Sequence, residues 1–375
     1  MQKQNEKNLT QLEIPRLSET FNLTDGHVHR RWDKKEKAII NKTAFFFRTV
    51  SREMQPKLEK EFKTSFYELS KQTVNDKKIN YLLCTSASMS LEIIANYLRL
   101  NKASLALIEP CFDNLADIFK RHNIKLEVIP EKYLIDSDLD NFLKSIKSSA
   151  ICLVSPNNPT GLAYSKENLE KFAKYCKYNN KFLIIDSSFR FYNDRENIFD
   201  EYALLNKIGV SYVFIEDTGK TWPTHDIKIS ILAISKKLFN DIYDIYTDFI
   251  LHASPFVIKL LTEFISNSKN DNLQKVYEVI EINRKFLYKN IKDTFLTPTE
   301  KSYASVAWLK IRNQLKAIEF KKILDKNGVY VLPGNYFFWS NKDNGDKFIR
   351  IALSRDTEKF KRAIEKLRIV CRKIK

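Results

Sequence analysis

Short apolar runs alternate with helical patterns between residues 79 and 235. Most runs carry valine, isoleucine, leucine or phenylalanine at successive positions, which is typical of strands covered by helices on both faces. The segments between them repeat apolar residues every three or four positions, as with Leu169, Phe172 and Cys176 in 165–178. Such alternation predicts an α/β fold with a mostly parallel, seven-stranded sheet flanked by helices. The predicted strands are Ile79–Cys84, Ser104–Ile108, Lys125–Ile129, Ala150–Val154, Phe182–Asp186, Tyr212–Glu216 and Ile229–Ile234.

The pattern changes after residue 254. Two long helical patterns, at 255–267 and 271–294, precede short apolar runs that alternate with further helices. These elements predict a smaller α+β C-terminal domain, with strands at Ala304–Ile311, Tyr330–Leu332 and Phe348–Leu353. The first 75 residues show no strand alternation, so we expect them to wrap around the outside. The predicted division is an N-terminal lid or arm, a large domain with the central sheet and a small domain, at residues 1–40, 41–255 and 256–375.

The charge of the chain raises the question of a polyanionic partner. Its 375 residues include 63 Lys and Arg against 46 Asp and Glu, a formal net charge of +17, which would suit a nucleic acid or an acidic membrane. The signs are mixed, however: Lys34, Lys35 and Lys37 lie beside Asp33 and Glu36. Mixed charges are typical of solvated helix surfaces. We therefore expect neither nucleic acid nor membrane as a partner, and a basic nucleic-acid-binding protein remains an alternative.

Glycine and cysteine narrow the class of protein. The chain has only 7 glycines and contains neither G-x-G-x-x-G nor G-x-x-x-x-G-K-[ST], which excludes the common dinucleotide and phosphate-loop motifs. Its 5 cysteines form no C-x-x-C pair, so we expect buried free thiols, no metal site and a reducing compartment. The polar N-terminus and the lack of a long apolar run predict a cytoplasmic protein.

Four polar side chains stand at the ends of predicted buried strands, or within one. Asn158 lies in the sequence Ser-Pro-Asn-Asn-Pro-Thr-Gly directly after one strand, and Asp186 ends the next. A buried carboxylate is costly unless it is paired, so Asp186 indicates a cationic partner. Lys220 follows a third strand, and Arg350 lies inside a late one. Each residue alone could be structural, but the ordered set of Asn, Asp, Lys and Arg indicates a chemical site.

This set resembles that of the fold type I, pyridoxal-phosphate (PLP) enzymes related to class I and II aminotransferases, over nearly the whole chain. The resemblance implies that Lys220 forms the Schiff base with PLP and that Asp186 stabilises the protonated pyridine nitrogen. It also implies that Asn158 lies beside the phenolic oxygen of the cofactor, and that Arg350 grips the α-carboxylate of the substrate.

The same resemblance implies where the rest of the cofactor binds. Its phosphate would lie at the start of a helix, where hydroxyls and backbone amides meet, at Ser86, Ala87 and Ser88. Phe112, two residues after a proline, would stack on the cofactor ring. Plain core packing is the other interpretation of Phe112.

Two positions depart from the common aminotransferase pattern. Phe189 stands three residues after Asp186, where those enzymes have a tyrosine, so Ser188 becomes the nearest hydroxyl for the phenolic oxygen. Lys228 stands where they place an arginine on the phosphate. Lysine supplies the charge of arginine without its bidentate geometry.

Three longer strings are similar to a narrower group, the PLP-dependent L-arginine oxidases and hydroxylases. They are Asn-Leu-Thr-Gln-x-Glu at 8–13, Asn-x-x-Asp-Gly-His at 22–27 and Glu-Asp-Thr-Gly-Lys-x-Trp-Pro-Thr-x-Asp-x-Lys at 216–228. The lysine-containing string is the most specific of the three. The resemblance implies a homodimer whose active sites are shared between the subunits.

The resemblance to this group also implies how the substrate is held. Thr10 and Glu13 would reach the substrate, Asp217 with Glu13 and Asp25 would hold its guanidinium, and His27 would be a catalytic histidine that directs water or oxygen chemistry. A buried cationic group needs such carboxylates. From the residues alone, Glu13 and Asp25 could equally be solvated acids, and His27 a surface or capping residue.

The implied activity is oxidation of L-arginine by molecular oxygen, through a quinonoid and with release of hydrogen peroxide. The product would be 4-hydroxy-2-oxoarginine, a dehydroarginine or 2-oxoarginine, and the sequence does not choose among them. An ordinary class I/II aminotransferase acting on a basic amino acid is the alternative within the family. A nucleic-acid-binding protein on an inactive PLP fold is the alternative of another class.

Overall fold

The computed structural model describes residues 8–50, 54–73, 79–193, 196, 198–271, 273–299 and 302–374. Its larger sheet has seven strands in the order β1-β7-β6-β5-β4-β2-β3. β7 pairs antiparallel with both of its neighbours and the other pairs are parallel, so the predicted mixed α/β fold is confirmed. The strands are β1 (Ile79–Cys84), β2 (Leu105–Glu109), β3 (Leu126–Pro130), β4 (Ala150–Val154), β5 (Phe182–Asp186), β6 (Ser211–Asp217) and β7 (Ser230–Ser235).

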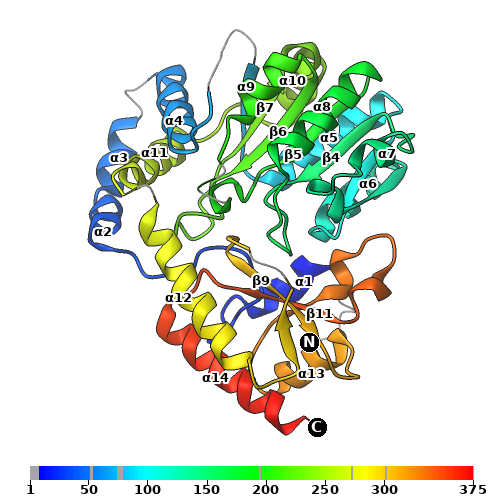
Figure 1. The fold of residues 1–375 in the computed structure, drawn as a ribbon. Coiled ribbons are helices and arrows are strands. Elements are labelled where there is room, and N and C mark those ends of the chain that lie inside the picture. Colours follow the sequence, from blue (N-terminus) through cyan, green and yellow to red (C-terminus); the bar gives the residue numbers. More distant parts are fainter. Residues whose placement is uncertain are drawn as a thin grey trace.

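Helices flank this sheet, which fills the upper half of Figure 1. They are α5 (Ala87–Leu100), α6 (Asp113–Arg121), α7 (Leu139–Leu143), α8 (Lys166–Tyr178), α9 (Glu201–Ile208) and α10 (Lys236–Phe249). α5 packs against α6 and α10, whereas α8 packs against α7 and α9. The predicted stripe of α8 is buried, and the Ser165 hydroxyl caps its first turn by accepting from the Asn168 N–H.

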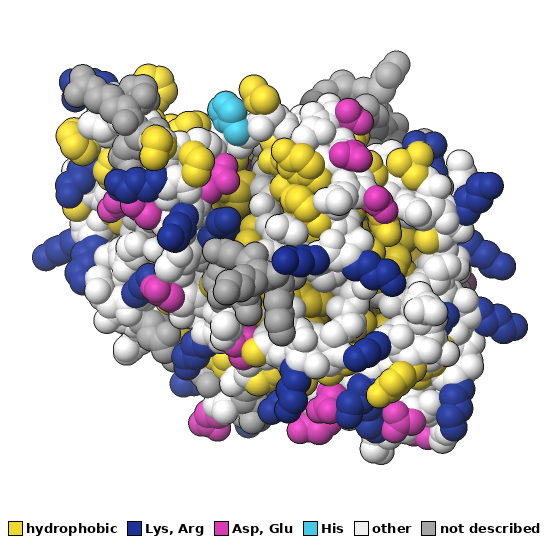
Figure 2. Space-filling view, turned by 90° about the horizontal axis from the view of Figure 1, so that it is seen from above, with side chains coloured by type: hydrophobic (Ala, Val, Ile, Leu, Met, Phe, Trp, Pro, Cys, Tyr) yellow, Lys and Arg dark blue, Asp and Glu magenta, His cyan; other side chains and the backbone are white. Residues whose placement is uncertain are grey.

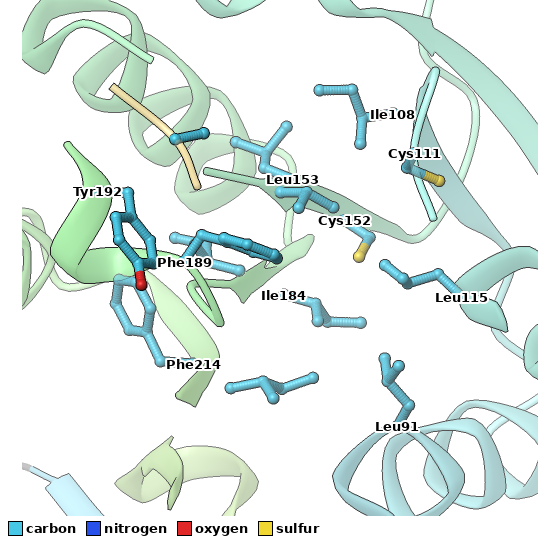
Figure 3. Close-up of a cluster of buried hydrophobic side chains, with 14 of the residues drawn as sticks. Leu91, Ile108, Cys111, Leu115, Cys152, Leu153, Ile184, Phe189, Tyr192 and Phe214 are labelled. Atoms are coloured by element: carbon cyan, nitrogen blue, oxygen red, sulfur yellow. The ribbon is translucent and has the colours of Figure 1, made fainter. Parts of the chain in front are cut away.

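The core lies on both faces of the strands. Cys152 and Leu153, neighbours on β4, are both wholly buried although their side chains point to opposite faces. Leu91 of α5 and Leu115 of α6 contribute to the same cluster, together with Cys111 (Figure 3). Burial raises the pKa of the Cys111 and Cys152 thiols well above the usual value. All five cysteines are free and buried, as predicted.

The C-terminal elements form a second, antiparallel sheet in the order β10-β11-β9-β8, which lies below the first in Figure 1. Its strands are β8 (Leu296–Pro298), β9 (Val306–Ile311), β10 (Leu332–Pro333) and β11 (Phe348–Ala352), and its helices are α12 (Gln274–Ile291), α13 (Ala317–Lys326) and α14 (Thr357–Lys373). The pattern missed β8, because three residues are too few to show alternation. The three-unit division of the chain stays a prediction.

The expectation that the first 75 residues wrap around the outside is wrong for residues 9–13 and 55–69, because Leu9, Phe62 and Phe66 are buried in the core. Leu9 and Leu12 of α1 (Leu9–Glu13) are buried against Trp308 and Phe337 of the C-terminal unit. The chain then passes the small sheet, where the Ala352 N–H donates to the Leu23 carbonyl. A five-residue helix is too short to show a periodic stripe, which is why the pattern did not reveal it.

The remaining helices continue this N-terminal part. α2 (Lys34–Asn41), α3 (Thr43–Thr49) and α4 (Gln55–Leu69) pack against α11 (Pro255–Lys269). Short 3-10 helices lie at Ile14–Arg16, Glu131–Leu134, Arg190–Tyr192, Gly334–Phe337 and Lys342–Gly345. Within the described ranges, no helix is both long and apolar enough to cross a bilayer.

The surface carries its charges in a mixed arrangement. On the face seen in Figure 2, lysine and arginine side chains are scattered, with acidic and hydrophobic side chains among them. Opposite charges also pair along exposed helices, as Lys174 does with Glu170 at 2.6 Å. This pattern is typical of solvated surfaces and agrees with the sequence interpretation.

Candidate active site

The carboxyl ends of the central strands open into a cavity of about 220 Å³. Residues of α1 and of β11, a strand of the smaller sheet, line it as well, so both sheets contribute to its walls. All but one of the predicted site residues line it, namely Thr10, Glu13, His27, Ser86, Ala87, Ser88, Phe112, Asn158, Asp186, Ser188, Asp217, Lys220, Lys228 and Arg350. Gly26, Asn114 and Phe189, which the sequence strings and the departures from the family pattern had pointed to, also line it, whereas Leu91, Leu115 and Val154 are lining residues that the sequence had not identified.

His27 lies between the two lysines of the cavity. Its Nε2 is 3.4 Å from the Lys220 Nζ and 3.4 Å from the Lys228 Nζ. Its Nδ1 lies 3.4 Å from the Asp25 Oδ1 and its Nε2 lies 3.3 Å from the Asp226 Oδ1, so a carboxylate stands beside each ring nitrogen. The positive charge of Lys220, together with burial, lowers the pKa of His27. A neutral imidazole therefore faces the Lys220 amine.

Asp25 is the predicted site residue that the cavity does not include. Its carboxylate accepts from Arg355 at 3.0 Å, from Asn22 at 2.8 Å and from the backbone N–H of His27 at 3.1 Å, and it contacts the His29 Nε2 at 2.8 Å. Burial acts to raise the pKa of Asp25, but the Arg355 guanidinium and the two imidazoles hold it well below its usual range. With its oxygens engaged by these partners, Asp25 supports His27 from outside the cavity lining, and its predicted contact with the substrate stays a prediction.

The Asp25–Arg355 pair leads to a prediction about stability. Asp25→Asn leaves the buried Arg355 guanidinium without its countercharge, so we expect a loss of about 3 kcal/mol in the free energy of unfolding. Because folding lowers the pKa of Asp25, the ion pair stabilises the protein at any pH above the ordinary pKa of an aspartate, and this stabilisation disappears only as the pH falls below that value. The full effect of Asp25→Asn should therefore appear at about pH 7. Urea denaturation measures it.

The matched control for this prediction is an exposed pair. Asp293 lies 3.5 Å from the Arg368 guanidinium on the surface, where ion pairs contribute about 0.5 kcal/mol or less. Asp293→Asn should therefore leave the denaturation midpoint nearly unchanged. Equal losses for the two variants would contradict a special role for Asp25.

Asp186 stands at the end of β5 with its carboxylate facing the cavity. One of its oxygens accepts both from the Ser188 hydroxyl at 2.6 Å and from the Ser188 N–H at 2.9 Å. Burial raises the pKa of Asp186, against the effect of these two bonds. The Ser188 hydroxyl thus supports Asp186 here, whereas the sequence had assigned it to a phenolic oxygen. A buried carboxylate of this kind is suited to a cationic ring nitrogen.

The lysine-containing string places two acids on opposite faces of β6. Asp217 lines the cavity, whereas Glu216 points the other way and is wholly buried. The Arg190 guanidinium donates to Glu216 at 2.6 Å and pairs with Glu201 at 3.0 Å. Burial raises the pKa of Glu216 to about 7, with Arg190 opposing it. Glu216 and its partners are therefore structural, and Asp217 is the one of these two β6 acids that lines the cavity.

Arg350 of β11 is wholly buried and lines the cavity. Its guanidinium donates to the Asn158 Oδ1 at 3.1 Å, to the Glu13 Oε1 at 3.1 Å and to the Thr24 carbonyl. It lies 6.0 Å from the centre of the Phe112 ring, close enough for a cation–π contact. Sequence reasoning identified Arg350 but gave no sign that Glu13 pairs with it.

A further part of the cavity lining, at the start of α5, has the features of an anion site. The Ser86 hydroxyl caps α5, accepting from the Met89 N–H at 3.2 Å, and the hydroxyls and amides of this helix start line the cavity with the Lys228 cation. A Cβ on Gly219 would lie 2.9 Å from the Lys228 Cδ, so this glycine allows Lys228 to pack against the backbone.

These donors together fit PLP. A helix start with hydroxyls and a lysine suits its phosphate, Asp186 its ring nitrogen, Asn158 its phenolic oxygen, and the Lys220 amine its aldehyde. Phe112 lines the same cavity as an aromatic neighbour for the ring. The individual roles stay predictions, but the set of donor types matches the cofactor.

Comparison with known proteins gives the family. Residues 16–367 match the sequence model of the family Aminotransferase class I and II. A histidinol-phosphate aminotransferase of Methanococcus maripaludis is 26% identical over 251 residues, which cover 64% of this chain and 64% of that protein. The HTH-type transcriptional regulator NorG of Staphylococcus aureus is 24% identical over 319 residues, or 82% of this chain and 69% of that protein.

Solved structures agree with the family match. The structure of MppP soaked with the product 2-ketoarginine has a TM-score of 0.85 and 28% identity, and the match covers 92% of this chain and 98% of that one. A PLP-bound putative aminotransferase from Clostridium difficile has a TM-score of 0.78 at 18% identity, with 94% and 92% covered. The chain therefore belongs to the aminotransferase class I and II family, the PLP-dependent enzymes of fold type I.

Proposed function

We propose that this PLP enzyme oxidises L-arginine with molecular oxygen. The observation that carries the proposal is that two carboxylates, Glu13 and Asp217, line the same cavity as Lys220 and Arg350. A substrate held there by Arg350 through its α-carboxylate would meet acidic groups with its side chain. The similarity to MppP, whose structure was solved with 2-ketoarginine as its product, supports arginine as the substrate.

Glu13 and Asp217 offset the repulsion between a cationic substrate and the net positive charge of the protein. A protein with a net charge of +17 repels a cationic ligand at long range, so its selectivity must come from local groups. A guanidinium that leaves water for a cavity needs carboxylates that replace its hydration. Thr10 lies on α1 one turn before Glu13 and lines the same cavity, where its hydroxyl adds an acceptor.

The residues of the chain divide the remaining work. Bound PLP supplies an electron sink that makes the Cα proton of an amino acid acidic. The Lys220 amine is the base for that proton, because Lys220 lines the cavity and its Nζ lies 3.4 Å from the His27 Nε2. His27, held by Asp25, can then pass a proton between Lys220 and a water molecule. Leu91, Leu115 and Val154 contribute apolar side chains to the lining of the same cavity.

The overall reaction balances without an oxo acid. In a two-electron oxidation, one arginine, one dioxygen and one water give 2-oxoarginine, ammonia and one hydrogen peroxide. In a four-electron oxidation, two dioxygen and two water molecules are used, and 4-hydroxy-2-oxoarginine, ammonia and two hydrogen peroxide are formed. A dehydroarginine is the desaturated product. The proposal covers these outcomes as one class, since each draws its electrons from arginine and delivers them to oxygen.

Product analysis tests the proposal. Purified holoenzyme incubated with arginine under air, without any oxo acid, should release ammonia and an oxidised arginine product that mass spectrometry identifies. Under nitrogen the products should not accumulate beyond one equivalent of enzyme. Equal product formation under nitrogen would contradict the role of oxygen.

An ordinary aminotransferase acting on a basic amino acid is the second candidate. It is favoured by the similarity to a histidinol-phosphate aminotransferase over 64% of the chain. An aminotransferase keeps the amino group on the cofactor until an oxo acid accepts it, so its turnover requires an added oxo acid and consumes no oxygen. Either enzyme would be a homodimer with shared active sites, as is typical of the fold.

A further inference from the structure

We propose that substrate binding exchanges ion pairs at Arg350: the α-carboxylate of the substrate takes the place of the Glu13 carboxylate, and the released Glu13 pairs with the cationic end of the same substrate molecule. Glu13 would then select against amino acids that lack a distal cation, in addition to holding arginine. This inference rests on the proposed function for the identity of the substrate.

The contacts of Arg350 carry the first step. Among the described residues, Glu13 supplies the only carboxylate hydrogen-bonded to its guanidinium, at 3.1 Å. The other two partners, the Asn158 amide oxygen and the Thr24 carbonyl, are neutral. Arg350 is wholly buried, so its charge depends on a carboxylate at this position. An amino acid that binds to Arg350 must therefore compete with Glu13.

The surroundings of Glu13 carry the second step. Its side chain is 13% exposed and lines the same cavity as Lys220 and Asp217. Its backbone belongs to α1, which is fixed by the buried Leu9 and by the Leu9 N–H donating to the Asp113 carboxylate at 2.7 Å. The helix can stay in place while the side chain rotates from Arg350 toward a ligand.

A buried carboxylate that loses its countercharge destabilises the complex. Arginine brings both a carboxylate for Arg350 and a guanidinium for Glu13, so one ion pair is broken and two are formed. Norleucine has a similar linear side chain but no charge, so it would displace Glu13 from Arg350 and leave it unpaired. The exchange therefore predicts that Glu13 weakens the binding of neutral amino acids.

Calorimetric titration of the holoenzyme under nitrogen, with arginine and with norleucine, tests the exchange. We expect Glu13→Gln to weaken the binding of arginine by about tenfold or more and to strengthen the binding of norleucine by about tenfold, because Arg350 is then free to bind any carboxylate. The matched control is Glu19→Gln: Glu19 follows α1 on the same segment, lies 4.0 Å from the Arg16 guanidinium and does not line the cavity. Both affinities should stay unchanged in this control.

The opposite result for norleucine would overturn the exchange. If Glu13 only held the guanidinium, Glu13→Gln would weaken the binding of arginine and would leave the binding of norleucine unchanged or weaker. Glu13→Ala, which also frees Arg350, gives the same expected gain and serves if the glutamine variant does not fold. The outcome is separate from the proposed function: oxygen uptake by the unaltered enzyme could stand without a gain in norleucine binding, and that gain could appear in an aminotransferase that uses no oxygen.

Discussion

Replacing Lys220 by alanine is expected to reduce kcat with arginine by at least about a thousandfold. Lys220 follows β6 and lines the cavity, where its Nζ lies 3.4 Å from the His27 Nε2. We assign to it both the covalent link to PLP and the transfer of the Cα proton. Both functions need its amine, so alanine should remove them together. Steady-state kinetics and the visible absorbance of the bound cofactor measure the two losses separately.

Lys236→Ala is the matched control for Lys220→Ala. Lys236 is an exposed lysine at the start of α10, just after β7, and its replacement should leave both the kinetics and the absorbance unchanged. The Lys220 assignment would be wrong if the alanine variant kept the absorbance of a covalently linked cofactor and turned over arginine at a comparable rate. Lys228, which also lines the cavity, would then be the amine to examine.

Replacing Asp186 by asparagine should lower kcat by about a hundredfold. The carboxylate is buried at the end of β5 and its pKa is raised by burial, so a cationic ring nitrogen is the partner that would keep it ionised. An amide has nearly the same shape but no charge, and a protonated ring would no longer be stabilised. Stopped-flow measurement of Cα proton loss, with deuterated arginine for comparison, follows this step.

Ser188→Ala provides the graded comparison for Asp186→Asn. It removes the 2.6 Å bond that the hydroxyl donates to Asp186 but leaves the carboxylate in place. We expect a loss of several-fold at most, since one hydrogen bond contributes about 1 kcal/mol. If Asp186→Asn cost no more than Ser188→Ala, the charge of Asp186 would not matter to the reaction.

Much of the fold could be predicted because its strands are covered on both faces. A strand such as β4, buried at all five positions, reads as an uninterrupted apolar run, and the helices between such strands carry clear stripes. Shorter elements gave no such signal. The three residues of β8 and the five of α1 are held by tertiary contacts, so their position follows from the packed structure and not from a periodic pattern.

The residues of the site likewise divide into those that stand out in the sequence and those whose role depends on the folded structure. Asn158, Asp186, Lys220 and Arg350 could be identified because polar residues stand out against apolar strands, and the cavity brings all four together. The function of Asp25 could not be inferred, because it depends on Arg355, a residue from a segment 330 positions away that donates to its carboxylate. The string that contains Asp25 marked the right region but did not separate residues that line the cavity from those that support them.

Oxygen consumption by the purified holoenzyme distinguishes an arginine oxidase from an aminotransferase. With arginine as the only added substrate and no oxo acid present, we expect uptake of at least one dioxygen for each arginine consumed, with hydrogen peroxide accumulating in the same proportion. Norleucine should give little uptake under the same conditions. No oxygen uptake with arginine, together with turnover that begins only when an oxo acid is added, would show that the enzyme is an aminotransferase and not an oxidase.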